Sequence, residues 1–138
     1  MSSCVSGADL VDKTRFKEVL DGQIGLIDEI FTDREKAYCR KHNDPLKHLA
    51  ACFAVKEACL KALGMGLSGI GIDRVLRDIE FIPDSCGKAQ LFTQGWVANR
   101  AVRRGITRWA VSVSHCSQFA LATVVAQNEV PVPQHGVR

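Results

Sequence analysis

The sequence predicts a small α+β domain in which a mostly antiparallel sheet packs on one long central helix. Three observations lead to this prediction. The chain has 138 residues, 46% hydrophobic and 24% charged, which is enough for one core. Apolar residues recur at helical spacing over residues 46–63. Over residues 109–115, larger side chains alternate with small ones, as expected of a half-buried strand.

The first third of the chain is expected to contain one strand and two helices. A short strand over residues 5–11 should lead into a helix over residues 13–20. Thr32 and Glu35 have the spacing of a capping box, in which each residue satisfies a free amide of the other. This motif predicts a second helix that runs to about Arg40.

The central helix has both a start and a stop signal. Asp44-Pro45 should begin it, because Asp caps free amides and Pro fits the first turn. Gly64 should end it in the left-handed conformation. Residues 64–71 then hold four glycines, which predict a tightly turning loop that either lets the backbone approach a ligand or only connects elements. No Gly-Lys-Ser/Thr ending follows, so a nucleoside-triphosphate loop is not predicted.

The second half of the chain is expected to hold most of the sheet. The predicted elements are strands over 79–82 and 89–92 that form a hairpin, a helix over 95–104 that Gly105 ends, and strands over 109–115 and 119–126. Residues 127–138 contain two prolines and no apolar period, so a loose tail is expected there. The predicted domain therefore covers residues 1–126.

Composition narrows the class of protein. The net charge of +3 suits an anionic ligand or an acidic partner and is too small to predict nucleic-acid binding. No run of about 18 apolar residues is present, and the start lacks a basic segment followed by an apolar one, so neither membrane nor secretory segments are expected. The six cysteines form no Cys-x-x-Cys pair, so a zinc or redox motif is not predicted. A reducing cytoplasm is the compartment that fits these cysteines best.

Glu57 and Lys61 lie one turn apart on the central helix, with Phe53 one turn earlier. Two interpretations of this spacing remain open. The first is a solvated ion pair that adds a few tenths of a kcal/mol to the helix. The second is a functional pair, in which the carboxylate binds a hard metal ion and the ammonium binds a phosphate.

His115 ends a predicted strand beside two serines, at a turn. Taken alone, it is either a half-buried or capping histidine or part of a site. A serine hydrolase is not predicted, because the Gly-x-Ser-x-Gly segment that would present a nucleophile is missing.

Taken together, several short segments resemble the holo-(acyl-carrier-protein) synthase family, the short single-domain branch of the 4′-phosphopantetheinyl transferases. The resemblance covers about residues 5–126, in order, and includes the stretch that precedes the central helix. The segments that carry it are Gly7-Ala8-Asp9, the Phe53–Ala58 stretch with Lys61–Gly64, Asp78-Ile79-Glu80, Gly87, Gly95, Gly105 and Ser112-Val113-Ser114-His115, with Thr32–Cys39 before the central helix.

The resemblance implies an activity and a fold. Such an enzyme moves the phosphopantetheine arm of coenzyme A to a serine of an acyl carrier protein and releases adenosine 3′,5′-bisphosphate. Magnesium is the implied cofactor and coenzyme A the substrate. Magnesium prefers a few carboxylates and takes its other oxygens from water and substrate phosphates, which fits the residues present.

Roles for individual residues follow by match to the family motifs. Asp9 and Glu57 are the implied magnesium ligands, and Lys61 would contact the diphosphate. Glu57 or a metal-bound water is the first choice for the base that takes the serine proton, with His115 as the second choice. The positions implied to line the coenzyme A site are Lys61, Gly64, Ser112, Ser114 and His115.

The resemblance also implies partners. Acyl carrier proteins are acidic, and family members meet them with a basic first helix, so Arg15, Lys13 and Lys17 become candidate contacts. The alternative for these three cations is a solvated helix face. A homotrimer whose active sites are shared between neighbouring subunits is also implied.

One position departs from the family pattern. Many members carry Arg before the Phe-Ala pair, where this chain has Cys52. Either a nearby cation compensates, with Lys47, His48 and Lys56 as candidates, or coenzyme A binds more weakly. Two other functions therefore stay open: a non-catalytic coenzyme A-binding module, which only Cys52 favours, and a domain excised from a larger fatty-acid or polyketide synthase. The starting Met and the loose tail favour a free-standing enzyme.

Overall fold

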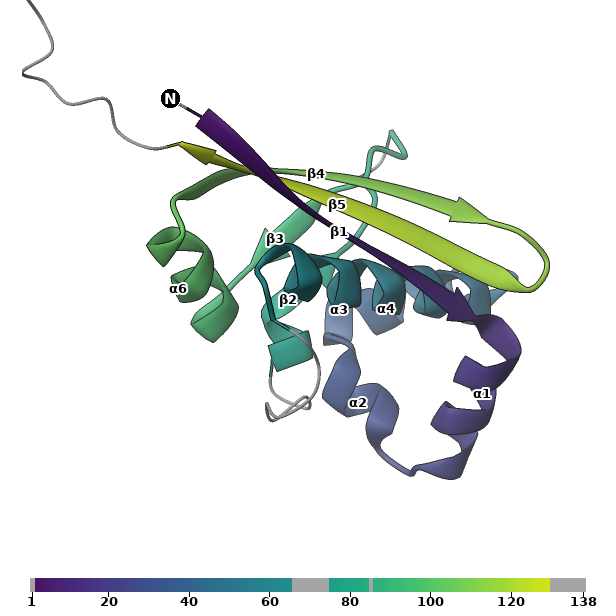
Figure 1. Ribbon diagram of the computed structural model, residues 1–138. Helices are drawn as coiled ribbons and strands as arrows, with labels where there is room; N and C mark the ends of the chain where they lie inside the picture. The colour runs from purple at the N-terminus through teal and green to yellow at the C-terminus, as the bar shows by residue number, and fades with distance from the viewer. Residues whose placement is uncertain (1, 66–74, 85, 130–138) are drawn as a thin grey trace, which may run out of the picture.

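The computed structural model describes residues 2–65, 75–84 and 86–129 of the chain (Figure 1). Its elements, in chain order, are β1 (Ser2–Asp12), α1 (Lys13–Gly22), α2 (Leu26–Ile30), α3 (Asp33–Arg40), α4 (Pro45–Ala62), a 3₁₀ turn η1 (Leu76–Asp78), β2 (Ile79–Phe81), β3 (Leu91–Thr93), α6 (Gly95–Arg103), β4 (Ile106–His115) and β5 (Phe119–Glu129). None of the helices in these ranges is long and apolar enough to cross a membrane.

The three long strands form one antiparallel sheet in the order β1-β5-β4, and β2 and β3 form a separate hairpin. Figure 1 shows α4 running beneath the long sheet, with α1 and α2 at one end and α6 at the other. The expected α+β architecture, with an antiparallel sheet on a long central helix, is confirmed.

The contact between α4 and the sheet is built from small side chains. Over residues 120–126 of β5, every second residue turns toward the helix and is fully buried: Ala120, Ala122, Val124 and Ala126. On α4, Ala54, Ala58 and Ala62 recur every four residues and are buried as well. Small side chains on both surfaces let the helix backbone lie close to the strands.

The start signals predicted for α3 and α4 are confirmed. At α3, the Thr32 hydroxyl accepts the amide of Glu35 at 3.2 Å, and the Glu35 carboxylate accepts the amide of Thr32 at 2.9 Å. At α4, the Asp44 carboxylate accepts the amide of Lys47 at 3.2 Å, and Pro45 occupies the first turn. Gly64 follows the helix with a φ of 74°, the left-handed conformation that its position requires.

The last strand is longer than predicted. β5 continues through residues 127–129, which had been assigned to the loose tail, and these residues pair with Ser2–Cys4 of β1. The correction has a simple cause: β5 is the central strand, and its two neighbours hold its backbone after its apolar pattern has ended. The rest of the expected tail, residues 130–138, lies outside the described residues, as does most of the glycine-rich loop.

A buried ion pair joins the helices to the hairpin. Lys56 on α4 and Glu35 on α3 have 0% and 1% side-chain exposure, and Lys56 Nζ lies 2.8 Å from Glu35 Oε1. Lys56 also donates to the backbone carbonyls of Leu76 and Ile79. Glu35 Oε2 accepts the amide of Phe81 at 2.9 Å. The network therefore satisfies both charges and fixes η1 and β2 against α4.

Candidate functional site

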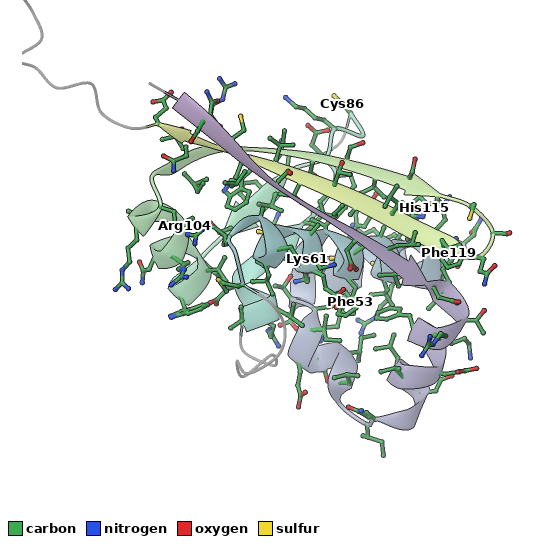
Figure 2. All side chains as sticks on the ribbon, viewed as in Figure 1. Phe53, Lys61, Cys86, Arg104, His115 and Phe119 are labelled. Carbon is green, nitrogen blue, oxygen red and sulfur yellow. The ribbon has the colours of Figure 1, made fainter. Side chains whose placement is uncertain are left out.

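The first group of predicted site residues comes together between β1 and α4. Asp9 on β1 points to the helix, and its side chain is only 10% exposed. Lys61 Nζ lies 2.8 Å from Asp9 Oδ1 and also donates to the carbonyl of Ala8 at 3.2 Å. Figure 2 shows Lys61 on α4 beneath β1. Glu57, one turn before Lys61, completes the group.

The two carboxyl groups of this site influence each other. Burial, followed by the neighbouring Asp9 carboxylate, raises the pKa of Glu57 to about 8, against the opposing effect of the Lys61 ammonium. The hydrogen bond to Asp9 raises the pKa of Lys61, which therefore stays charged. Near neutral pH, the raised pKa therefore keeps Glu57 mostly protonated beside the charged ammonium of Lys61.

A metal ion would satisfy an atom that the protein leaves without a partner. Asp9 Oδ2 is buried and has no hydrogen-bond partner within the described ranges when Glu57 is ionised; a protonated Glu57 shares a side-chain hydrogen bond with Asp9, which helps to raise the pKa of Glu57. Buried polar atoms normally have one. A hard divalent cation would bind this oxygen and would replace the proton of Glu57, so the residues present fit the magnesium site implied by the sequence.

A cavity of about 820 Å³ opens beside this group. Its walls are mostly apolar residues of β1, α1, α2 and α4, among them Phe16 and Phe53, whose rings stack 5.0 Å apart. Glu57 and Arg15 both line it. A ligand in this cavity would therefore contact the first helix and the carboxyl group of Glu57 together.

The three predicted carrier-protein contacts have different surroundings. Lys13 Nζ donates to the carbonyl of Cys116 at 2.6 Å and so ties α1 to the turn between β4 and β5. Lys17 forms an exposed pair with Asp21 at 2.8 Å, as the solvated-face interpretation expects. Arg15 has no side-chain hydrogen bond or ion pair within the part of the chain that is described, and it lines the large cavity.

A second cavity, of about 350 Å³, holds another part of the predicted site. Ser112 and His115 of β4 line it, and Ser114 does not. Two further residues line it: Tyr38 from α3, which had no predicted role, and His48 from α4, a candidate to compensate for Cys52. Their rings lie 5.6 Å apart, edge to face. Burial and the nearby cations lower the pKa of His115, with burial the larger cause.

The two cavities lie on opposite sides of α4. Glu57 lines the first and His48 the second, and the two residues are nine positions, about two and a half turns, apart. Figure 2 places His115 at the far end of β4, away from Lys61. A single chain therefore separates the implied metal and diphosphate residues from the implied coenzyme A residues Ser112 and His115.

Gly64 lies apart from both cavity walls as the structure describes them. It ends α4, and the guanidinium of Arg104 packs against the space where its side chain would be, with Nη2 3.1 Å from a Cβ built at this position. Figure 2 shows Arg104 at the end of the molecule opposite His115.

Cys52 lies in the wall of the second cavity and in the buried network at once. It is 2% exposed, and its thiol donates to Glu35 Oε2 at 2.8 Å. Lys56 cannot compensate for the missing arginine, because its ammonium is already held by Glu35 and two carbonyls. Among the described residues, no lysine or arginine lines this cavity, and His48 is the remaining candidate in its wall.

Comparison with known proteins identifies the family of the chain. The family model described as the 4′-phosphopantetheinyl transferase superfamily matches residues 6–124. The chain belongs to this superfamily. The predicted family is thereby confirmed.

Individual relatives and solved structures are similar over nearly their whole length. The holo-[acyl-carrier-protein] synthase of Syntrophotalea carbinolica is 39% identical over 120 residues, which cover 86% of this chain and 91% of the relative. The synthase of the same name from Caldanaerobacter subterraneus is 32% identical and covers 87% of this chain and 91% of its own. The Chronobacterium ammoniagenes ACPS–CoA complex is 28% identical, with a TM-score of 0.81, and the alignment covers 93% of this chain and 99% of that one.

Proposed function

We propose that this superfamily member is a holo-(acyl-carrier-protein) synthase. It transfers the 4′-phosphopantetheine group of coenzyme A to a serine of an apo-acyl carrier protein and releases adenosine 3′,5′-bisphosphate. The observation that carries the proposal is the group formed by Asp9, Glu57 and Lys61 beside an open cavity. The names of the relatives support the same activity.

The transfer exchanges one phosphorus–oxygen bond for another. The serine oxygen of the carrier protein forms a bond to the phosphorus next to the pantetheine arm, while the bond to the bridging diphosphate oxygen breaks. That oxygen leaves with the adenosine bisphosphate. The serine proton passes to a base of this chain, with Glu57 as the first candidate and His115 as the second.

Each side chain of the group formed by Asp9, Glu57 and Lys61 has a role in this reaction. Asp9 and Glu57 would hold Mg²⁺. Two observations support this: Asp9 Oδ2 is buried without a partner when Glu57 is ionised, and the neighbouring Asp9 carboxyl group helps to raise the pKa of Glu57. When bound, the ion neutralises charge on the diphosphate of coenzyme A. Lys61 gives up its contact with Asp9 in part and places its ammonium on the same phosphates.

The complete site requires a second copy of the chain. Ser112 and His115 lie across α4 from Glu57, so one coenzyme A molecule is held by Asp9, Glu57 and Lys61 of one subunit and by the second cavity of its neighbour. The sheet face turned away from α4 exposes Leu10, Leu121 and Val125 to 58%, 40% and 40%. We place the subunit contact of a homotrimer on this apolar face.

The acidic carrier protein docks on α1. Arg15 is the main contact, since it lines the cavity that also contains Glu57. Lys13 and Lys17 add to the positive charge of the same helix. The free thiols of all six cysteines suit a reducing compartment such as the cytoplasm.

A coenzyme A-binding module without catalysis is the second candidate, and the uncharged wall at Cys52 is the observation that favours it. The intact mass of an apo-acyl carrier protein separates the two. After incubation with this chain, coenzyme A and Mg²⁺, we expect a gain of one phosphopantetheine group, which is lost with EDTA and with Glu57→Gln but kept with the control Glu129→Gln. Coenzyme A binding without any gain, across several carrier proteins, would favour the module.

A further inference from the structure

The space at Gly7 decides how closely β1 approaches α4. A Cβ built on Gly7 would collide with the carbonyl oxygen of Ala58 and would lie 2.7 Å from the backbone nitrogen of Ala62. Both neighbours are backbone atoms, which cannot rotate away as a flexible side chain would. Gly7 does not have a positive φ, so its conformation is open to any residue. It is the missing side chain that this contact requires.

This contact lies beside the group formed by Asp9, Glu57 and Lys61. Gly7 and Asp9 are two residues apart on β1, so both turn toward α4. On the helix, Ala58 follows Glu57 and Ala62 follows Lys61. The two backbones thus touch next to Glu57 and Lys61 on the helix. On the strand, they touch two residues before Asp9.

We propose that Gly7 is a positioning residue for the magnesium site, setting the distance between Asp9 on the strand and the Glu57–Lys61 pair on the helix. This inference rests on the proposed function. Mg²⁺ binds oxygens at about 2.0–2.1 Å in a strict geometry, so it tolerates little change in the spacing of its ligands. Asp9 has a short side chain that cannot follow if β1 moves away.

A purely structural role for Gly7 makes a different forecast. If the residue only helps the strand and helix to pack, Gly7→Ala lowers stability and leaves the folded molecules with normal metal affinity. If it positions the site, metal affinity falls in the folded protein, because the carboxyl groups of Asp9 and Glu57 are then too far apart. Metal binding, measured separately from stability and from turnover, distinguishes the two roles.

The experiment compares Gly7→Ala with Gly22→Ala in the full-length chain. Gly22 is the matched control, because an added Cβ there meets nothing within 4 Å. Mn²⁺ serves as the probe for the Mg²⁺ site, and the free ion is measured by electron paramagnetic resonance with coenzyme A present. We expect Gly7→Ala to weaken Mn²⁺ binding about 10- to 100-fold, the usual effect of disturbing the support of a metal ligand. Gly22→Ala should bind like the wild type.

Each remaining outcome also decides the inference. Folded Gly7→Ala that binds Mn²⁺ as tightly as Gly22→Ala overturns it. If Gly7→Ala does not fold, the milder Ala58→Ser decides. It adds one atom to the fully buried side chain of the residue whose backbone carbonyl faces Gly7. A weaker Mn²⁺ affinity supports the inference, and an unchanged one overturns it.

If the wild-type chain binds no Mn²⁺, the metal site of the proposed function is contradicted. The distance between Asp9 on β1 and Lys61 on α4 is then compared in crystal structures of the wild type and Gly7→Ala. In that case, a 2.8 Å contact between Asp9 Oδ1 and Lys61 Nζ retained in Gly7→Ala overturns the positioning role, and a lengthened contact supports it.

Discussion

Lys56 and Glu35 form an ion pair 2.8 Å long in which both side chains are inaccessible to solvent. Removing one partner leaves the other charge buried and unpaired, which costs about 3–5 kcal/mol in comparable pairs. We therefore expect Lys56→Met to lower the free energy of unfolding by that amount, as measured by urea denaturation. The control Lys17→Met breaks an exposed pair and should cause no measurable change. Equal stability of the two variants would contradict the structural role of the buried pair.

The raised pKa of Glu57 predicts how stability varies with pH when no metal is bound. A carboxyl group whose pKa rises from 4.5 in the unfolded chain to about 8 in the folded protein binds its proton more tightly when folded. Its contribution to stability is complete below pH 4.5 and is lost as the pH rises toward 8. In EDTA, the melting temperature should therefore fall across this window in the wild type.

Glu57→Gln is the variant that isolates this effect. An amide cannot titrate, so the part of the pH dependence that comes from Glu57 should disappear, while the fold persists. Saturating Mg²⁺ should also flatten the wild-type curve, because the ion takes the place of the proton. Identical curves for wild type and Glu57→Gln in EDTA would show that the carboxyl group of Glu57 is not protonated at neutral pH.

Local sequence patterns predicted those features that depend on neighbours in the chain. The capping box of Thr32 and Glu35, the start of α4 at Pro45 and its end at Gly64 were all predicted from residues within one turn. The missed helix α2 has only five residues, and Gly25 before it provides no side-chain cap. Its formation depends on packing rather than on a start signal, so the sequence carried little sign of it.

The site required long-range information that spacing does not contain. The i,i+4 relation of Glu57 and Lys61 was visible, but the contact of Lys61 with Asp9 joins the helix to a strand 52 residues earlier in the chain. The family resemblance placed Asp9, Glu57 and Lys61 in one site but did not predict this contact. The role of Glu35 as partner of Lys56 had no sequence signal, since the two lie on different helices. The separation of Ser112 from Glu57 by α4 likewise depends on tertiary packing.

Arg15 offers a test of the carrier-protein surface. Reversing its charge in Arg15→Glu should weaken binding of an acidic carrier protein on the order of tenfold at low salt and have little effect at high salt, because steering by charge is screened. Coenzyme A affinity should stay the same. The control is Arg103→Glu, the same charge reversal at an exposed residue of α6, at the end of the molecule away from α1 (Figure 1). Surface plasmon resonance at two salt concentrations gives the comparison, and equal losses for both ligands would contradict the proposed contact.

The proposed division of the site between subunits predicts complementation. Glu57→Gln removes the first half of the proposed site and His115→Ala the second, so each variant alone should lose most of its transfer activity. After the two variants are mixed, unfolded and refolded together, some sites combine an intact Glu57 with an intact His115 from the neighbouring chain. Activity should then exceed that of either variant alone. An inactive mixture that nevertheless contains mixed oligomers would contradict a site shared in this way.

Cys52 tests whether the uncharged wall of the second cavity limits coenzyme A binding. In Cys52→Arg, the long side chain has the cavity of about 350 Å³ to extend into, where no other lysine or arginine of the described residues lies. We expect a lower KM for coenzyme A, and a larger decrease at low salt, because the new cation meets an anionic ligand.

The same substitution should lower the free energy of unfolding. It removes the thiol contact with Glu35 and replaces a well-packed core residue by a larger one, which costs about 1–3 kcal/mol. Cys86→Arg, at an exposed cysteine, is the control for added charge alone. An unchanged KM in a folded Cys52→Arg protein would show that another cation, such as one from a neighbouring subunit, already serves the phosphate groups of coenzyme A.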